Sequence, residues 1–129
     1  MIWVDLVTLL ALVQFFLFAA AVSRARTRYG VHAPAITGHA IFERYFRVHQ
    51  NTLELLVLFI PSMWLAVRYF FPTYIAAIGV LFLVGRAWYF FVYVGDPGKR
   101  TWSAALSFLP IFIFWIIAAI GIVRALLNS

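Results

Sequence analysis

Four apolar segments, each about 20 residues long, constrain the fold of this chain more than any other feature of its sequence. They run from about Ile2 to Val22, from Asn51 to Phe70, from Thr73 to Val94 and from Trp102 to Val123. A helix of about 20 apolar residues crosses the hydrocarbon layer of a bilayer, which is about 30 Å thick. The connections between the segments are short and leave no room for a further domain. We therefore expect residues 1–129 to form one all-α integral membrane domain, a bundle of four transmembrane helices.

The composition is typical of a membrane protein and argues against a nucleic-acid partner. Hydrophobic residues make up 66% of the chain and charged residues only 11%, far outside the range of soluble domains. The net charge is +6, but the basic residues are scattered at the ends of apolar segments and form no long run. The chain has no cysteine, so thiol chemistry would need a sulfur that a cofactor brings. The histidines lack the close spacing of metal ligands, and we expect no metal site.

The distribution of basic residues predicts the orientation of the chain in the membrane. Loop 23–50 contains Arg24, Arg26, Arg28, Arg44 and Arg47, loop 95–101 contains Lys99 and Arg100, and the opposite side has only Arg68 and Arg124. Loops rich in arginine and lysine stay on the cytoplasmic side. We therefore expect both basic loops to be cytoplasmic and both termini to lie on the opposite side. Orientation in the membrane is also the simplest explanation for Arg24 and Arg28.

A polar stripe leads into the second apolar segment, within the stretch FERYFRVHQNTLEL at residues 42–55. On a helix its polar side chains share an arc of about 120°; they are Glu43, Arg44, Arg47, Gln50, Asn51 and Glu54. No polar residue follows Glu54 until Ser62, so the stripe reaches the edge of the membrane core. Ionisable groups at that depth are costly and usually face a bundle interior or a water-filled cavity, which predicts a functional site.

A second polar group lies on the third apolar segment and in the turn that follows it. Arg86, Tyr89 and Tyr93 lie within about 60° on one face of a helix. The turn-forming sequence GDPGKR then ends in Arg100. This turn and the polar stripe are expected on the same side of the membrane. We therefore expect the guanidinium groups of Arg26, Arg47, Arg86 and Arg100 to converge there with Asn51 and the two tyrosines.

This convergence predicts a binding site for an anionic ligand. Only Glu43, Glu54 and Asp96 are available as counter-charges, and desolvated guanidinium groups in excess need an anionic partner. Arginine binds carboxylates bidentately, an amide pairs with peptide groups, and a carboxylate can receive an ammonium group. A small zwitterionic peptide with net negative charge satisfies all three. A salt-bridge network that only holds the helices together is the structural alternative.

The runs FERYFRVHQNTLE and GRAWYFFVYVGDPGKR resemble the MAPEG family, the membrane-associated proteins in eicosanoid and glutathione metabolism. The similarity extends from the arginine cluster after the first apolar segment to the start of the fourth. The spacing of glutamate, arginine, asparagine and glutamate in residues 43–54 is the most specific part of it. Arg86, Tyr89, Tyr93 and Arg100 then follow in the order that the family shows.

The resemblance implies a homotrimer of four-helix protomers that binds glutathione between neighbouring subunits. The positions that match glutathione-binding residues are Arg47, Asn51, Glu54, Tyr89 and Tyr93, with Arg86 in a supporting place and His49 where it can line the site. Arg26 resembles the arginine that reaches the same glutathione from the adjacent subunit. Arg100 resembles the arginine that stabilises the glutathione thiolate.

The resemblance implies that the protein is a glutathione transferase, which can also have glutathione peroxidase activity. Its substrates would be lipophilic small molecules that reach the site from the membrane lipid. The chain differs from the leukotriene-forming members at Thr27, Leu55, Trp88 and Gly95, which argues against leukotriene synthesis. Two alternatives stay open. One is a non-enzymatic, lipid-binding relative in the same family, and the other is a small membrane channel or transporter.

Overall fold

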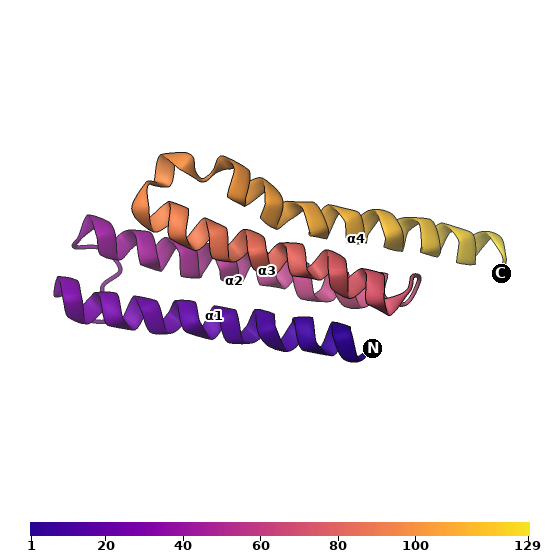
Figure 1. The fold of residues 1–129 in the computed structure, drawn as a ribbon, viewed down its shortest axis with the longest axis horizontal. Helices are drawn as coiled ribbons and strands as arrows, with labels where there is room; N and C mark the ends of the chain where they lie inside the picture. Colours follow the sequence, from indigo (N-terminus) through magenta and orange to yellow (C-terminus); the bar gives the residue numbers. More distant parts are fainter.

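The computed structural model describes residues 1–129 and contains four long helices that lie side by side (Figure 1). Helix α1 spans Ile2–Tyr29, α2 spans Ala40–Ala66, α3 spans Pro72–Gly95 and α4 spans Thr101–Leu127; a short 3-10 helix, η1, spans Pro97–Lys99. The predicted all-helical bundle of four helices is confirmed.

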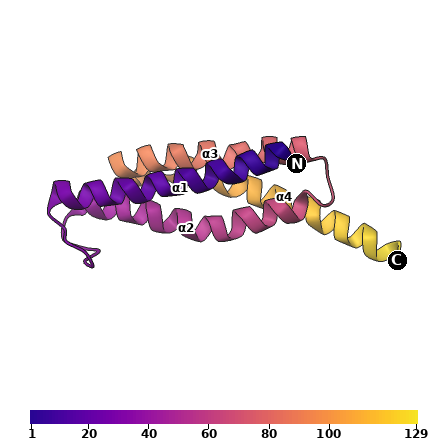
Figure 2. The same cartoon turned by 90° about the horizontal axis from the view of Figure 1, so that it is seen from below.

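Successive helices run in opposite directions along the bundle (Figures 1 and 2). The two termini therefore lie at one end, and the α1–α2 loop and η1 lie at the other. The C-terminal part of α4 extends beyond the other helices, and its residues from Ile122 onward are exposed. The bundle thus separates the basic loops from the termini, which is the arrangement that the predicted orientation requires.

Helices α1, α3 and α4 are each long and apolar enough to cross a membrane. Helix α2 has 27 residues, as many as α4, but its first half carries the polar stripe, so its crossing stays a prediction. All four helices are longer than the apolar segments that predicted them, most of all α1 and α2. Helix α1 continues to Tyr29 and α2 already begins at Ala40, because arginine and glutamate are good helix formers beyond the apolar part of each segment. Helix α2 also ends at Ala66, before the predicted end at Phe70, and a turn connects it to α3.

The main core lies in the half of the bundle that contains the termini. All four helices contribute to it, and its aromatic centre is Phe59 of α2, Phe82 of α3 and Phe114 of α4, each fully buried. The rings of Phe59 and Phe82 stack with centroids 3.9 Å apart. Apolar packing is therefore concentrated away from the polar stripe, which leaves the other half of the bundle free to hold polar side chains.

The helix ends beside the basic loops are fixed by local caps. Gly30 ends α1 in the left-handed conformation, with φ of 69°, which glycine adopts without steric cost. The Nδ1 atom of His39 accepts a hydrogen bond of 3.2 Å from the backbone N–H of Ile41 at the start of α2. An oxygen of Asp96 accepts one of 3.1 Å from the N–H of Gly98. His39 and Asp96 are thus capping residues.

Gly85 allows the backbones of α3 and α4 to approach closely, and replacing it by alanine is expected to destabilise the bundle. A Cβ atom there would lie 2.9 Å from the backbone nitrogen of Ser107, which has no room to move because Ser107 is itself buried. Overpacking of this kind costs about 1–3 kcal/mol. Thermal unfolding of the purified protein in detergent measures the loss. Gly95→Ala is the control, since nothing lies within 4 Å of a Cβ atom at that position; an equal loss in both variants would contradict the close-approach explanation.

Candidate functional site

A groove with a volume of about 380 Å³ lies between α2 and α3, at the end of the bundle that holds the basic loops. It is lined by Ile36, Thr37, Glu43, Phe46, Arg47, Gln50, Asn51, Glu54, Tyr89 and Tyr93. The polar stripe of α2 forms one wall and the two tyrosines of α3 form the other. We call this site the α2–α3 groove. Its volume is within the range of small-molecule sites, which is roughly 300–1,000 Å³.

Arg86 lies beneath the groove and is fully buried. Its Nη2 atom donates hydrogen bonds of 2.9 Å to the side-chain oxygens of Asn51 and Thr52. Its guanidinium carbon lies 4.3 Å from the ring centroid of Tyr89. The Nε and Nη1 atoms have no hydrogen-bond partner. Two neutral oxygens and an aromatic face therefore hold this cation. No carboxylate is among its partners, so Arg86 does not belong to the salt-bridge network that we considered as the structural alternative.

The contact with Arg86 orients Asn51 toward the groove. Because the oxygen of the Asn51 amide accepts from Arg86, the amide NH₂ group is left to donate to a ligand. Tyr89 and Tyr93 stack with ring centroids 5.4 Å apart, and both line the groove. The groove thus combines a fixed amide donor with two phenol groups.

Arg47 and Glu54 are the exposed charged groups of this wall. They are two helical turns apart, about 10 Å along the axis of α2. A carboxylate and an ammonium group on one ligand can therefore be bound at opposite ends of the groove. The structure brings together five of the residues that the sequence predicted, namely Arg47, Asn51, Glu54, Tyr89 and Tyr93, with Arg86 directly behind them.

Two of the predicted arginines lie elsewhere in a single chain. The Nη1 atom of Arg26 donates to the carbonyl of Ala35 at 2.6 Å, and its guanidinium group lies 4.9 Å from the ring centroid of Phe42. The Nη1 atom of Arg100 donates to the carbonyl of Pro97 at 2.9 Å, within its own turn. The expected convergence of four arginines is therefore not found within one chain, because each of these two is folded back onto a nearby backbone carbonyl.

His49 also faces away from the groove. Its ring stacks on Phe15 of α1 with centroids 4.6 Å apart, and its Nε2 atom is buried without a hydrogen-bond partner. Position 49 is on the side of α2 opposite the polar stripe, which directs it toward α1. The expectation that His49 lines the site is not met within the chain.

The charges of the groove also differ from the expectation. Its lining contains one guanidinium group, from Arg47, and two carboxylates, from Glu43 and Glu54. With Arg86 beneath, the positive and negative charges are equal in number. The predicted excess of guanidinium groups therefore does not exist in one chain, and a ligand with net negative charge needs further cations to balance it.

Two polar residues of the candidate site, Thr52 and Thr37, were not predicted from the sequence. The hydroxyl oxygen of Thr52 accepts a hydrogen bond from Arg86 and so holds the guanidinium group in place. The same hydroxyl donates a hydrogen bond of 2.7 Å to the carbonyl of Val48. A signal for it was present, since Thr52 is polar and directly follows Asn51. Thr37 reaches the groove from the α1–α2 loop, whose path no periodic pattern predicts.

Arg44 joins the polar stripe to the end of α3. Its Nη1 atom donates to the carbonyls of Val94 and Gly95, at 3.0 and 3.2 Å, in the last turn of that helix. We expect Arg44→Gln to lower the free energy of unfolding by about 1–2 kcal/mol, because a cation and its hydrogen bonds at a helix C-terminus are lost. Thermal unfolding measures this change. Arg68→Gln, in the turn that follows α2 at the other end of the bundle, is the matched control, and an equal loss of stability there would contradict the capping role.

The chain is similar to known proteins over most of its length. The model of the MAPEG family matches residues 4–120. An uncharacterized protein of Synechocystis sp. is 39% identical over 122 residues, which is 95% of this chain and 89% of that protein. Microsomal glutathione S-transferase 2 of Mus musculus is 36% identical over 123 residues, or 95% of this chain and 84% of that protein. Leukotriene C4 synthase of Cavia porcellus is 31% identical over 123 residues, or 95% and 82%.

The family match and the relatives cover nearly the whole length of the helical bundle, and the relatives are matched over most of their own length. Three of the four helices are apolar enough to cross a membrane, as an integral membrane protein requires. The chain therefore belongs to the MAPEG family.

Proposed function

We propose that this protein is a membrane glutathione transferase that binds glutathione in the α2–α3 groove. The observation that carries the proposal is that Arg47, Asn51, Glu54, Tyr89 and Tyr93 line one cavity. Similar proteins carry the names glutathione S-transferase and leukotriene C4 synthase, which supports a glutathione-using enzyme at the level of the family.

The groove offers a partner to each polar group of glutathione. Arg47 binds one carboxylate bidentately, and Glu54 receives the ammonium group. The NH₂ group of Asn51, turned outward by Arg86, donates to a peptide carbonyl. The hydroxyl groups of Tyr89 and Tyr93 supply further hydrogen bonds from the wall of α3.

A homotrimer supplies the cations that a single chain lacks. Glutathione is net negative, whereas the groove of one chain is balanced in charge. Arg26 of an adjacent subunit would add a guanidinium group for the second carboxylate, in place of its hydrogen bond to Ala35. This bond is on the exposed surface, so exchanging it for a carboxylate costs little.

Arg100 activates the sulfur in this proposal. A free thiol with a pKa of about 8.5 is only a few per cent thiolate at pH 7. A guanidinium group next to the sulfur favours the anion. Lowering the thiol pKa to about 6.5 stabilises the thiolate by about 2.7 kcal/mol and makes it the major species. Arg100 is exposed and held only by the carbonyl of Pro97, so its side chain can turn toward a ligand.

The thiolate then attacks an apolar electrophile that reaches the site from the bilayer. In transfer, a carbon–sulfur bond forms and the leaving group departs with the electrons of the broken bond. In the peroxidase variant, the thiolate attacks the outer oxygen of a hydroperoxide, which leaves an alcohol and a sulfenic acid; a second glutathione converts the latter into a disulfide and water. The exposed apolar side chains of α1 and α4 face the lipid from which such substrates arrive.

The orientation that we propose places the groove at the cytoplasmic face, where glutathione is available. Loops 23–50 and 95–101 lie at one end of the bundle and the termini at the other, and the positive-inside rule assigns the basic end to the cytoplasm. Because the chain has no cysteine, single cysteines introduced at Ser129 and Thr37 allow sidedness to be measured by membrane-impermeant labelling.

Conjugation of glutathione to an apolar aryl halide, measured with the purified protein in detergent, tests the proposed activity. We expect saturable turnover in the unmodified protein. Arg47→Leu is expected to raise the KM for glutathione roughly 10-fold or more, since a charge-assisted hydrogen bond is lost. Arg68→Leu, in the turn after α2 at the opposite end of the bundle, is the control and is expected to leave KM unchanged. Absence of turnover in all three proteins would contradict the proposed function and favour a lipid-binding relative.

A further inference from the structure

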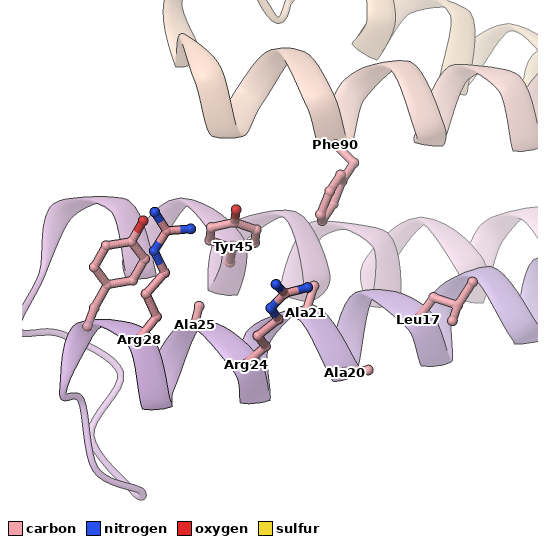
Figure 3. Close-up of a pocket in the computed structure, with 9 residues that line it drawn as sticks. Leu17, Ala20, Ala21, Arg24, Ala25, Arg28, Tyr45 and Phe90 are labelled. Carbon is pink, nitrogen blue, oxygen red and sulfur yellow. The ribbon is translucent and has the colours of Figure 1, made fainter.

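We propose that a second groove, alongside α1, binds an anionic phospholipid of the bilayer. This α1 groove has a volume of about 480 Å³ and lies on α1 where Tyr45 of α2 and Phe90 of α3 face it (Figure 3). Its residues are not those of the α2–α3 groove, and the proposed transferase chemistry uses none of them.

Two guanidinium groups at the rim of the α1 groove lack a counter-charge. Arg24 and Arg28 extend from α1 on the same side as Phe90 (Figure 3). They are one helical turn apart, so their Cβ atoms are about 5–6 Å from each other. Of the arginines near the end of α1, Arg26 alone is hydrogen-bonded to the chain, and no carboxylate lines the groove. A phosphate group between the two guanidinium groups would satisfy both.

The deeper part of the α1 groove is apolar and shaped for a hydrocarbon chain. Leu17 lies about 10 Å further into the membrane than Arg24, at 1.5 Å per residue. Ala20 and Ala21 lie between Leu17 and Arg24 on α1, and their small side chains leave a trough there. Phe90 closes the trough from α3 and is held by stacking on Phe18, with ring centroids 4.8 Å apart.

The α1 groove is positioned at the height of the lipid headgroups. Arg24 and Arg28 follow directly after the apolar segment that ends at Val22, at the end of the bundle that carries the basic loops. The positive-inside rule explains why arginines lie on this side of the membrane. It does not explain why two of them line the same apolar groove. Basic pockets between transmembrane helices on this side bind anionic headgroups.

The α1 groove also faces away from the subunit contact that the proposed trimer requires. On α1, positions 24 and 28 lie about 160° and 200° around the helix axis from position 26. If Arg26 reaches a neighbouring subunit, the rim arginines point to the outside of the assembly. Bilayer lipid is what contacts a transmembrane surface there, and its anionic species match the charge of the rim.

Lipid titration followed by native mass spectrometry tests this inference. The full chain, purified in neutral detergent, is titrated with phosphatidylglycerol or with phosphatidylcholine. We expect preferential retention of one phosphatidylglycerol per chain. In the double variant Arg24→Gln/Arg28→Gln, the affinity for phosphatidylglycerol is expected to fall roughly 30-fold, because two cationic contacts with the anionic headgroup are lost. Soluble glycerol phosphate is expected not to displace the lipid, since it lacks the acyl chains.

Two further variants separate the groove from general surface charge. Arg68→Gln/Arg124→Gln removes the same charge elsewhere and is expected to retain phosphatidylglycerol as the unmodified protein does. Ala21→Phe fills the trough while keeping both arginines and is expected to weaken retention. The inference is overturned if the two double variants lose lipid equally, if Ala21→Phe has no effect, or if glycerol phosphate displaces the lipid. It is also overturned if Arg24→Gln/Arg28→Gln changes the oligomeric mass, because the groove would then be a subunit interface.

Discussion

Replacing Arg100 by leucine is expected to reduce glutathione conjugation about 25-fold at pH 7 while glutathione affinity changes little. Without the guanidinium group the thiol returns to a pKa of about 8.5, and the thiolate fraction falls from about three quarters to about 3%. The loss depends on pH with a defined sign. As pH rises above 8.5 the thiol ionises without help, so the variant should approach the turnover of the unmodified protein. Turnover and ultraviolet thiolate absorbance, each measured from pH 6 to about pH 9, check both parts.

Lys99→Leu is the matched control for this experiment. Lys99 is the neighbouring cation, exposed in the same turn, and the proposal gives it no contact with sulfur. Its removal is expected to leave the pH profile in place. If thiolate absorbance and neutral-pH turnover both survive in Arg100→Leu, the role assigned to Arg100 is wrong, whereas an equal alkaline shift in both variants would indicate a general field effect.

Replacing Arg86 by methionine is expected to weaken glutathione binding roughly 10-fold or more, with little loss of stability in the absence of glutathione. Arg86 has no carboxylate partner, and two of its nitrogen atoms lack any hydrogen bond, so its burial contributes little to folding. Its effect on the ligand is indirect: it fixes the amide of Asn51 and lies on the ring of Tyr89. Arg86 is therefore a positioning residue.

The split between affinity and stability distinguishes this role from a structural one. Calorimetric titration with glutathione and thermal unfolding of the ligand-free protein measure the two quantities separately. Gln14→Met is the control, because the Gln14 amide also links two helices, through a bond of 2.9 Å to the carbonyl of Leu83, but lies outside the groove. A large loss of stability in Arg86→Met with unchanged glutathione affinity would show that Arg86 is a structural cross-link.

The helical bundle was predictable because its signal is local. Each apolar segment is long enough to form a helix on its own account, and the lengths of the connections make neighbouring helices antiparallel. The ends of α1 and α2 were missed because arginine-rich and glutamate-containing stretches give no hydropathy signal. Yet Gly30 and His39 mark these ends by their cap chemistry.

The wall of the groove was also predictable, since Arg47, Asn51 and Glu54 share a helix face. What the sequence could not provide is the conformation of long, exposed side chains. Arg26 and Arg100 each fold onto a nearby carbonyl, a local choice that depends on loop geometry. Their places in the proposed site depend on a ligand and on neighbouring subunits, and no periodic pattern encodes either.

The central claim is that the α2–α3 groove holds glutathione and that Arg100 contacts its sulfur. A structure of the protein with glutathione bound tests this most directly. Our account predicts a carboxylate of glutathione on Arg47, its ammonium group on Glu54 and its sulfur within about 3.5 Å of an Arg100 guanidinium group. Glutathione bound outside this groove, or in it with Arg100 still folded onto Pro97 and the sulfur facing only lipid, would contradict the account.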